Sequence, residues 1–298
     1  MSGGMDNDGY FTVRSSSLPG LPECELRWFA RAFPDLVYDA GFRLRNIRPS
    51  IAAPLGSGCH AGAAHLLDAK MKRGGINARV DVTDSIDRAV HEFRRITVET
   101  EAEPDDLTPN LPIGIGQVSR MMFAISDHVK TLFPIRVERR LTAIVPETCI
   151  RLSGQPDNVD GLGGPLCDTD DLAIRDLKCG RRYWWADPQL GAYAFLEDAQ
   201  GRAKVKDVKV DWCPRVAYSR EQPPVQVVDV NLNDAKRIAW SILHESHRAV
   251  TRWTYGSLEA QIKPGCPDVL MANPSSRLCS ARWCPAWGTD FCRHGKRD

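Results

Sequence analysis

The chain has 298 residues, of which 43% are hydrophobic and 26% are charged. This balance excludes disordered and fibrous proteins and predicts one or two globular domains. The 39 basic and 38 acidic side chains leave a formal net charge of +1, so a nucleic-acid partner would require a local basic patch. No run approaches the roughly 20 apolar residues of a membrane span, and the opening MSGGMDNDGY lacks the apolar stretch of a secretory signal. We therefore expect no membrane partner and a cytoplasmic location, in the host cytoplasm if the protein is phage-encoded.

The order of helical and strand-like patterns predicts an α/β fold with a central mixed sheet flanked by helices. Residues 1–22 are rich in Gly, Ser and Pro and predict a loose lead-in. Apolar residues at helical spacing predict helices over 23–33, 59–72, 85–95, 115–132, 187–196 and 233–252. Alternating apolar residues predict strands over 135–145, 148–154, 172–177 and 205–212. Gly56 to Gly58 should break the chain before the second helix, and Asn231 or Asn233 should cap the last one.

Two carboxylates and a lysine form the most informative group. Asp157 follows a predicted strand at GQPD, and Asp176 and Lys178 lie two apart, on one face of another strand. If the strands over 148–154 and 172–177 pair, both carboxylates can converge on one hard cation beside the lysine. Metal-assisted phosphodiester hydrolysis needs that arrangement. The alternative is a chance pair on a solvated strand face.

Four segments in a fixed order carry a family resemblance: GSGCHAGAAHLL, GQPDNVDG, IRDLKCG and QLGAY. The series resembles the RecB-type branch of the PD-(D/E)XK nucleases, which includes AddB-like recombination nucleases, CRISPR-associated exonucleases and many phage exonucleases. The resemblance spans 24–292. It implies a restriction-endonuclease-like nuclease domain over 23–262 and a cysteine-rich C-terminal cap over 263–298.

The same resemblance implies the site residues. The implied ligands of Mg²⁺ or Mn²⁺ are His60, Asp157, Asp176 and the carbonyl of Leu177, with Asp160 as the second choice for the Asp157 role. The implied catalytic residues are Asp157, Asp176, Lys178, Gln189 and Tyr193, of which the last two lie four apart on one helix face. The alternatives are a histidine satisfied beside a helix start, a surface glutamine and a core tyrosine. The chain departs from the family at Cys179, where Thr or Ser is usual, and it has no clear counterpart of the family's early-helix Glu.

Basic and aromatic residues directly follow the lysine. Arg181 and Arg182 precede Trp184 and Trp185. Arginines that bind phosphates and indoles that stack on bases suit single-stranded or frayed DNA, so we expect these four side chains to bind nucleic acid. The alternative is that one of the two tryptophans belongs to the core.

The C-terminal segment is dense in cysteine, with four of the ten cysteines within 266–292. In the family resembled, a C-terminal trio joins one upstream cysteine to hold a [4Fe–4S] cluster. The corresponding residues are Cys24, Cys279, Cys284 and Cys292, although the trio's spacing is wider than the family's commonest one. Cys266 is a rival fourth ligand, and a local set with Cys266 would suit a structural Zn²⁺ instead.

Together these features predict a metal-dependent DNA exonuclease that acts at DNA ends, in recombination, repair or phage DNA processing. The main alternative is a nuclease-like module that binds DNA or protein and has a purely structural metal site. A redox protein built on the cluster is a third reading. A homo-oligomer or a recombination partner protein is compatible with each of them.

Overall fold

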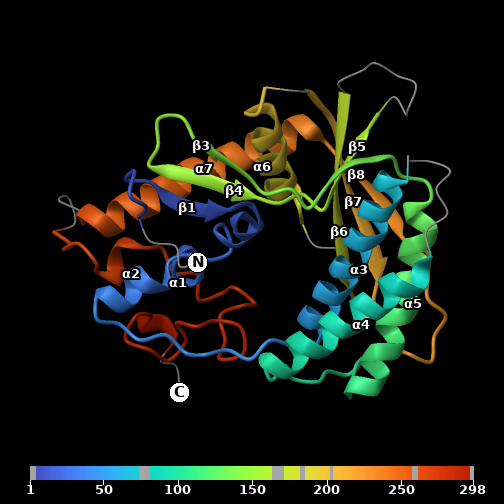
Figure 1. Cartoon of the computed structure of the whole chain (residues 1–298). Helices are drawn as coiled ribbons and strands as arrows, with labels where there is room; N and C mark the ends of the chain where they lie inside the picture. Colours follow the sequence, from blue (N-terminus) through green and yellow to red (C-terminus); the bar gives the residue numbers. More distant parts are fainter. Residues whose placement is uncertain are drawn as a thin grey trace.

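The computed structural model describes residues 5–73, 81–162, 171–181, 185–201, 204–256 and 261–295. The fold is α/β, with two mixed sheets flanked by helices (Figure 1). The predicted fold class is therefore confirmed, but two sheets replace the single central sheet that was expected. In these ranges no helix combines the length and the apolar character needed to cross a bilayer.

The larger sheet has five strands in the order β2-β5-β6-β7-β8. Strands β6 and β7 run parallel, and the other neighbours are antiparallel. Strand β6 opens with the fully buried run from Leu172 to Ile174, as is typical of a strand covered on both faces. The strands are β2 (Pro134–Val137), β5 (Asn158–Gly161), β6 (Asp171–Gly180), β7 (Lys204–Pro214) and β8 (Gln226–Val230).

The smaller sheet has the order β1-β4-β3, formed by β1 (Phe11–Arg14), β4 (Ile150–Gly154) and β3 (Leu141–Ile144). Its first strand lies in the segment predicted to be a loose lead-in, so that prediction was wrong. Strand β1 pairs with β4, and the short helix η1 (Ser15–Gly20) follows it. Val13 and Leu18 hold this segment in the core, because both are fully buried.

Two strand predictions fail for one reason, the passage of the chain between the sheets. The predicted strand over 135–145 is divided into β2 and β3, which belong to different sheets. Glu138 lies between them with φ of 45°, in the left-handed region that side chains rarely adopt and that interrupts a strand. The predicted pairing of 148–154 with 172–177 is also wrong, because β4 lies in the smaller sheet and β6 pairs with β5.

The helices that cover the sheets, α3 to α7, fall into two groups (Figure 1). Helices α3, α4 and α5 pack together on one side of the larger sheet, whereas α6 and α7 pack against each other and α6 contacts both sheets. Asn231 caps α7, since its Oδ1 accepts a hydrogen bond from Asp234 N at 3.0 Å. The helices are α1 (Glu25–Ala32), α2 (Pro34–Asp39), α3 (Ala52–Lys72), α4 (Val82–Glu99), α5 (Leu111–Val129), α6 (Asp187–Asp198), α7 (Leu232–Tyr255), η3 (Pro267–Val269) and η4 (Arg293–Gly295).

The glycines at 56–58 do not break the chain as predicted, because α3 begins at Ala52 and continues through them. Close helix packing explains part of the glycine content. A Cβ on Gly58 would lie 2.6 Å from the Ala89 carbonyl oxygen, and one on Gly62 would lie 2.8 Å from the Ser85 carbonyl oxygen. These glycines let α3 and α4 approach closely, so they serve packing rather than a turn.

The two ends of the described chain share one aromatic core. The Phe29 ring centroid on α1 lies 4.8 Å from that of Trp253 on α7, which lies 5.8 Å from that of Phe291. The buried carboxylate of Glu25 accepts a hydrogen bond from Met271 N at 2.9 Å and pairs with Arg252. Helix α1 is therefore held jointly by α7 and the C-terminal segment.

The contact between α6 and α7 predicts a large effect for one added methyl group. A Cβ on Gly191 would lie 2.0 Å from the Ala235 carbonyl oxygen. We expect Gly191→Ala to lower the free energy of unfolding by about 1–3 kcal/mol or more, measured by urea denaturation. The matched control is Gly56→Ala, whose Cβ would meet nothing nearer than 3.8 Å; it should be neutral or stabilising by up to about 1 kcal/mol. Equal free energies of unfolding for Gly191→Ala and the wild type would contradict the close packing of α6 on α7 at this glycine.

Candidate active site

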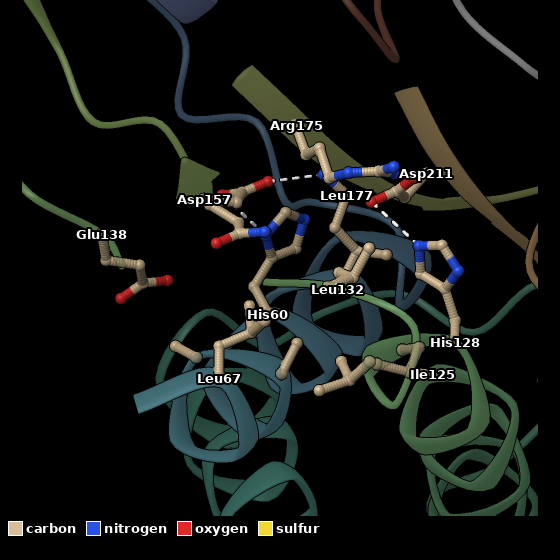
Figure 2. Close-up of a pocket in the computed structure, with 14 residues that line it drawn as sticks. His60, Leu67, Ile125, His128, Leu132, Glu138, Asp157, Arg175, Leu177 and Asp211 are labelled. Atoms are coloured by element: carbon tan, nitrogen blue, oxygen red, sulfur yellow. Dashed lines mark hydrogen bonds and ion pairs between the residues drawn. The ribbon is translucent and has the colours of Figure 1, made fainter. Parts of the chain in front are cut away.

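Asp157 lies at the bend where the chain passes from β4 to β5, and so from one sheet to the other. Its Oδ2 accepts a hydrogen bond from Leu177 N at 2.7 Å, and its Oδ1 lies 3.2 Å from Nδ1 of His60 (Figure 2). The regular pairing of β5 with β6 ends at Asn158 and Arg175. Beyond this pair, the Asp157 carboxylate accepts the hydrogen bond of Leu177 N that a backbone carbonyl would otherwise accept. Asp157 thus joins β6 to His60 on helix α3.

Asp176 is the most deeply buried carboxylate of this group, with 1% of its surface exposed. Its Oδ1 accepts a hydrogen bond from Gln189 Nε2 at 3.1 Å. Its Oδ2 lies 2.6 Å from Lys178 Nζ in an ion pair but accepts no hydrogen bond of normal geometry. Lys178 Nζ also donates to Gln189 Oε1 at 3.0 Å, so the glutamine holds both charged partners.

Helix α6 supplies the last two side chains of the group. Gln189 Nε2 donates to the Tyr193 hydroxyl at 2.8 Å, and both residues are buried, so the surface alternative for the glutamine does not apply. Gly154 permits this packing, because a Cβ there would lie 2.9 Å from the Tyr193 ring. The structure thus brings together all six side chains that the sequence singled out: His60, Asp157, Asp176, Lys178, Gln189 and Tyr193.

The backbone of Leu177 completes this arrangement. The N–H and C=O of one strand residue point to the same side, toward the same neighbouring strand. Since its N–H meets Asp157, the Leu177 carbonyl leaves β6 on the Asp157 side. This is the carbonyl predicted from the sequence as a metal ligand.

Burial and mutual charge set the protonation of the group. Burial raises the pKa of Asp176 to about 6, with Lys178 opposing the shift and Asp157 adding to it. Burial also disfavours both charges of the pair formed by His60 and Asp157, but their attraction outweighs it. The pKa of His60 is therefore raised and that of Asp157 is lowered. Asp176 is thus the carboxylate of this group that changes charge near neutral pH.

A small cavity adjoins the group, between α3, α5 and the larger sheet (Figure 2). His60 and Asp157 line it together with apolar side chains that include Leu67, Ile125 and Leu132. Its volume is about 20 Å³, which is room for one water molecule. A substrate must therefore approach from outside rather than through this cavity.

A buried ionic network that sequence reasoning missed lines the far side of the cavity. Arg175 Nε lies 2.8 Å from Asp160 and its Nη1 lies 2.6 Å from Asp211, whose other oxygen lies 3.1 Å from His128 Nε2. Asp160, the second choice for the Asp157 role, is thus engaged with Arg175. Glu138 also lines the cavity and was missed. Its left-handed backbone has no signal in the sequence.

The predicted nucleic-acid residues are only partly described. Arg181 is exposed and forms an ion pair with Asp106 at 2.9 Å. Trp185 is 45% exposed, which leaves its indole accessible for stacking. Arg182 and Trp184 lie outside the described residues.

Four cysteines gather around a second cavity, between α1 and the C-terminal segment. The cavity is lined by Cys24, Cys279, Cys284 and Cys292, together with other residues that include the buried Arg27; Cys266 is not among them. Burial raises the pKa of Cys284, and negative charge on the other three thiols would raise it further. The four sulfurs are therefore close enough that their charges interact.

As placed, no three His, Cys, Asp or Glu side chains of the described ranges surround a single ion position. At the carboxylate group this follows from the contacts above, because Asp157 faces His60 and Leu177 N while Asp176 faces Lys178 and Gln189.

No protein family and no characterised protein matches the sequence. Among solved structures, one similar chain is a candidate exonuclease from Eubacterium rectale. It is 13% identical, with 63% of this chain and 68% of the other covered and a TM-score of 0.39. A likeness at that score carries no argument about the reaction, so the function is inferred from the geometry of the site.

The raised pKa of Asp176 predicts a pH-dependent response to divalent cations. Without a cation, the contribution of Asp176 to stability is greatest below its ordinary pKa of 3.8 and is lost as pH rises through about 6. A cation needs the ionised carboxylate, so the increase in Tm caused by Mn²⁺ should grow as pH rises from 5 to 8. Differential scanning fluorimetry at each pH, with Asp176→Asn as the control, measures this. An equal increase at pH 5 and pH 8 would contradict it.

Proposed function

We propose that the protein is a metal-dependent deoxyribonuclease that hydrolyses phosphodiester bonds at DNA ends. The observation that carries the proposal is the convergence of Asp157, at a bend, with Asp176 and Lys178 of β6, and with His60, which lies 97 residues before Asp157 in the sequence. When His60 is neutral, the two carboxylates and the one ammonium leave one negative charge that a divalent cation would balance. A purely structural role would not require this unbalanced negative charge.

The donor set fits Mg²⁺ or Mn²⁺. Asp157, Asp176 and the Leu177 carbonyl supply oxygen, which hard cations prefer, and His60 supplies nitrogen. The buried Asp176 Oδ2 pairs with Lys178 but accepts no hydrogen bond of normal geometry, so a cation bound there would displace only that ion pair. A bound cation at this position supplies a water of lowered pKa and neutralises charge on the phosphate.

The side chains of the protein divide the remaining work. Lys178 is a compact cation held between Asp176 and Gln189. Asp176 would be shared with the cation in the loaded site, and Lys178 would there stabilise the charge that develops on the scissile phosphate. Gln189 limits how far the lysine moves, and its hydrogen bond to Tyr193 fixes the amide orientation. His60 keeps Asp157 turned toward β6.

Accessible cationic and aromatic groups near the end of β6 support DNA as the substrate. Arg181, three residues after Lys178, and the half-exposed Trp185, seven residues after it, offer a phosphate contact and a stacking surface. These residue types favour single-stranded or frayed ends. Recombination, repair or phage DNA processing in the cytoplasm, as a homo-oligomer or with a partner protein, is the setting we propose for the reaction.

We further propose that Cys24, Cys279, Cys284 and Cys292 hold a [4Fe–4S] cluster. Support comes from their shared cavity and from the buried position of Cys284 among the other three, because iron binding would neutralise the thiolates that such a position otherwise disfavours. In a [4Fe–4S] cluster each cysteine binds a different iron, so the sulfurs stand farther apart than around one zinc ion.

The nuclease proposal predicts the behaviour of Asp176→Asn. End-labelled single- and double-stranded DNA should be digested with Mg²⁺ or Mn²⁺ and not with EDTA. The variant should lose cleavage by at least about a hundredfold, because it loses a cation ligand, while it still binds DNA. The shortened end also gives the polarity of digestion.

Two outcomes would contradict the nuclease proposal. One is cleavage by Asp176→Asn at the wild-type rate. The other is DNA binding without turnover under any divalent cation by a folded protein whose cysteine site is loaded; this would favour the binding module. Asp160→Asn is the matched control, since Asp160 pairs with Arg175 and not with Lys178, so cleavage should persist in the folded variant.

The cluster proposal is tested by metal analysis of protein purified without oxygen. We expect about four iron and four sulfide per chain, with a broad visible absorption band. Cys284→Ser should lose the iron, and Cys266→Ser, outside the cavity, should keep it. One zinc per chain, lost in both variants, would instead establish the local zinc site that includes Cys266.

A further inference from the structure

An extended segment rich in arginine joins α2 to α3. Between Gly41 and Ser50 it has no helix or strand, and Arg43, Arg45 and Arg48 are all exposed. No acidic residue occurs from 40 to 50. Arg48 pairs with Glu101 at 2.6 Å, whereas Arg43 has no ion pair with any residue in the described part of the chain.

The C-terminal segment lies against this loop and adds to its charge. Arg45 donates to the Pro285 carbonyl through its backbone N–H at 2.8 Å and to the Ala281 carbonyl through Nη1 at 3.2 Å. In Figure 1 the blue loop after α2 accordingly runs beside the red C-terminal coil. The contact brings Arg282 and Trp283 to the same region of the molecule.

The C-terminal residues supply an aromatic surface as well as charge. Trp283 is 38% exposed, and the Arg282 guanidinium lies 4.9 Å from the centre of its ring. Arg277 is also exposed, and no acidic residue occurs from 274 to 289. We refer to Arg43, Arg45, Arg277, Arg282 and Trp283 as the arginine face.

The arginine face leads toward the candidate active site through α3. The loop ends where α3 begins, at Ala52, and His60 lies about 12 Å farther along the helix axis. On the way, Gly56 lies against Cys179, the residue after Lys178, since a Cβ on the glycine would be 3.8 Å from the Cys179 carbonyl oxygen. A single strand that leaves the site along α3 would therefore run toward the loop that carries Arg43 and Arg45.

We propose that the arginine face binds the part of a single DNA strand that extends away from the scissile bond; this rests on the proposed function. Guanidinium groups bind phosphates, and an exposed indole with an arginine stacked on it suits an unpaired base. In a chain whose net charge is only +1, residues 40–50 and 274–289 hold five arginines and no acid of their own, and Glu23, which accepts a hydrogen bond from Ser276, is a neighbouring carboxylate. The excess of arginine gives the local patch that nucleic-acid binding requires. The exposed indole favours a single strand over a duplex, whose bases are stacked.

The test is binding of a fluorescent single-stranded 20-nucleotide oligothymidylate in EDTA, over a range of salt. The variant Arg43→Ala/Arg277→Ala/Arg282→Ala should bind at least about tenfold more weakly. Its slope of log affinity against log salt should be smaller by about 2, at about 0.7 per phosphate contact. Trp283→Ala should also lose about tenfold and Trp283→Phe much less, because the ring is kept.

The matched control is Arg237→Ala/Arg248→Ala. These two exposed arginines lie on α7 and pair there with Asp234 and Glu245. Affinity and salt slope should be unchanged. Because Arg43 has no ion pair in the described ranges, Arg43→Glu gives a second variant whose folding should not suffer; its thermal melt is compared with the wild type. Wild-type affinity in the folded triple variant would overturn the inference, as would equal competition by polyglutamate and unlabelled oligothymidylate.

Substrate length separates this inference from the nuclease proposal. The triple variant should cleave a tetranucleotide at the wild-type rate and lose activity on the 20-nucleotide strand. If Asp176→Asn is inactive while the triple variant binds and cleaves both substrates normally, the arginine face is wrong and the nuclease stands. If no variant or wild-type protein cleaves, but the triple variant loses binding, the face stands and the nuclease is wrong.

Discussion

The burial of two carboxylates beside one ammonium is the constraint on which the candidate site depends. Asp176 is almost fully enclosed, and Asp157 stands close enough to raise its pKa. Such a pair is tolerable only if every nearby donor faces it. Lys178, Gln189, His60 and the N–H of Leu177 do so. These donors come from strand β6, helix α6 and helix α3. The start of β5 at Asn158 matters for the same reason, because no backbone carbonyl of β5 then faces the N–H of Leu177, which binds the Asp157 side chain instead.

Local spacing accounts for two contacts within this group. Asp176 and Lys178 meet because strand residues two apart share a face, and Gln189 reaches Tyr193 because helix residues four apart are neighbours. Which strands pair is a different matter, since it depends on contacts between distant parts of the chain. The expected pairing of β4 with β6 therefore failed, although Asp157 still reaches β6 through the bend that follows β4.

The features that the sequence did not reveal depend on burial. Arg175, next to Asp176, is indistinguishable in the sequence from a solvated arginine on the opposite strand face. In the structure it bridges Asp160 and Asp211 inside the protein. The glycines of α3 were taken for a break because the close approach of α4, which requires them, is visible only in three dimensions. Spacing reports the face on which a residue lies, but not what will cover that face.

The shared aromatic core of the two chain ends has a consequence for how the protein is made. Phe29 packs on Trp253, and Trp253 packs on Phe291, so the core around α1 lacks these partners until Phe291 has left the ribosome. Chains usually fold from the N-terminus as domains emerge. Here the first helix must wait with its apolar face uncovered, and closing a loop of that length carries an entropic cost. Until then the exposed aromatic surface makes the nascent chain prone to aggregate.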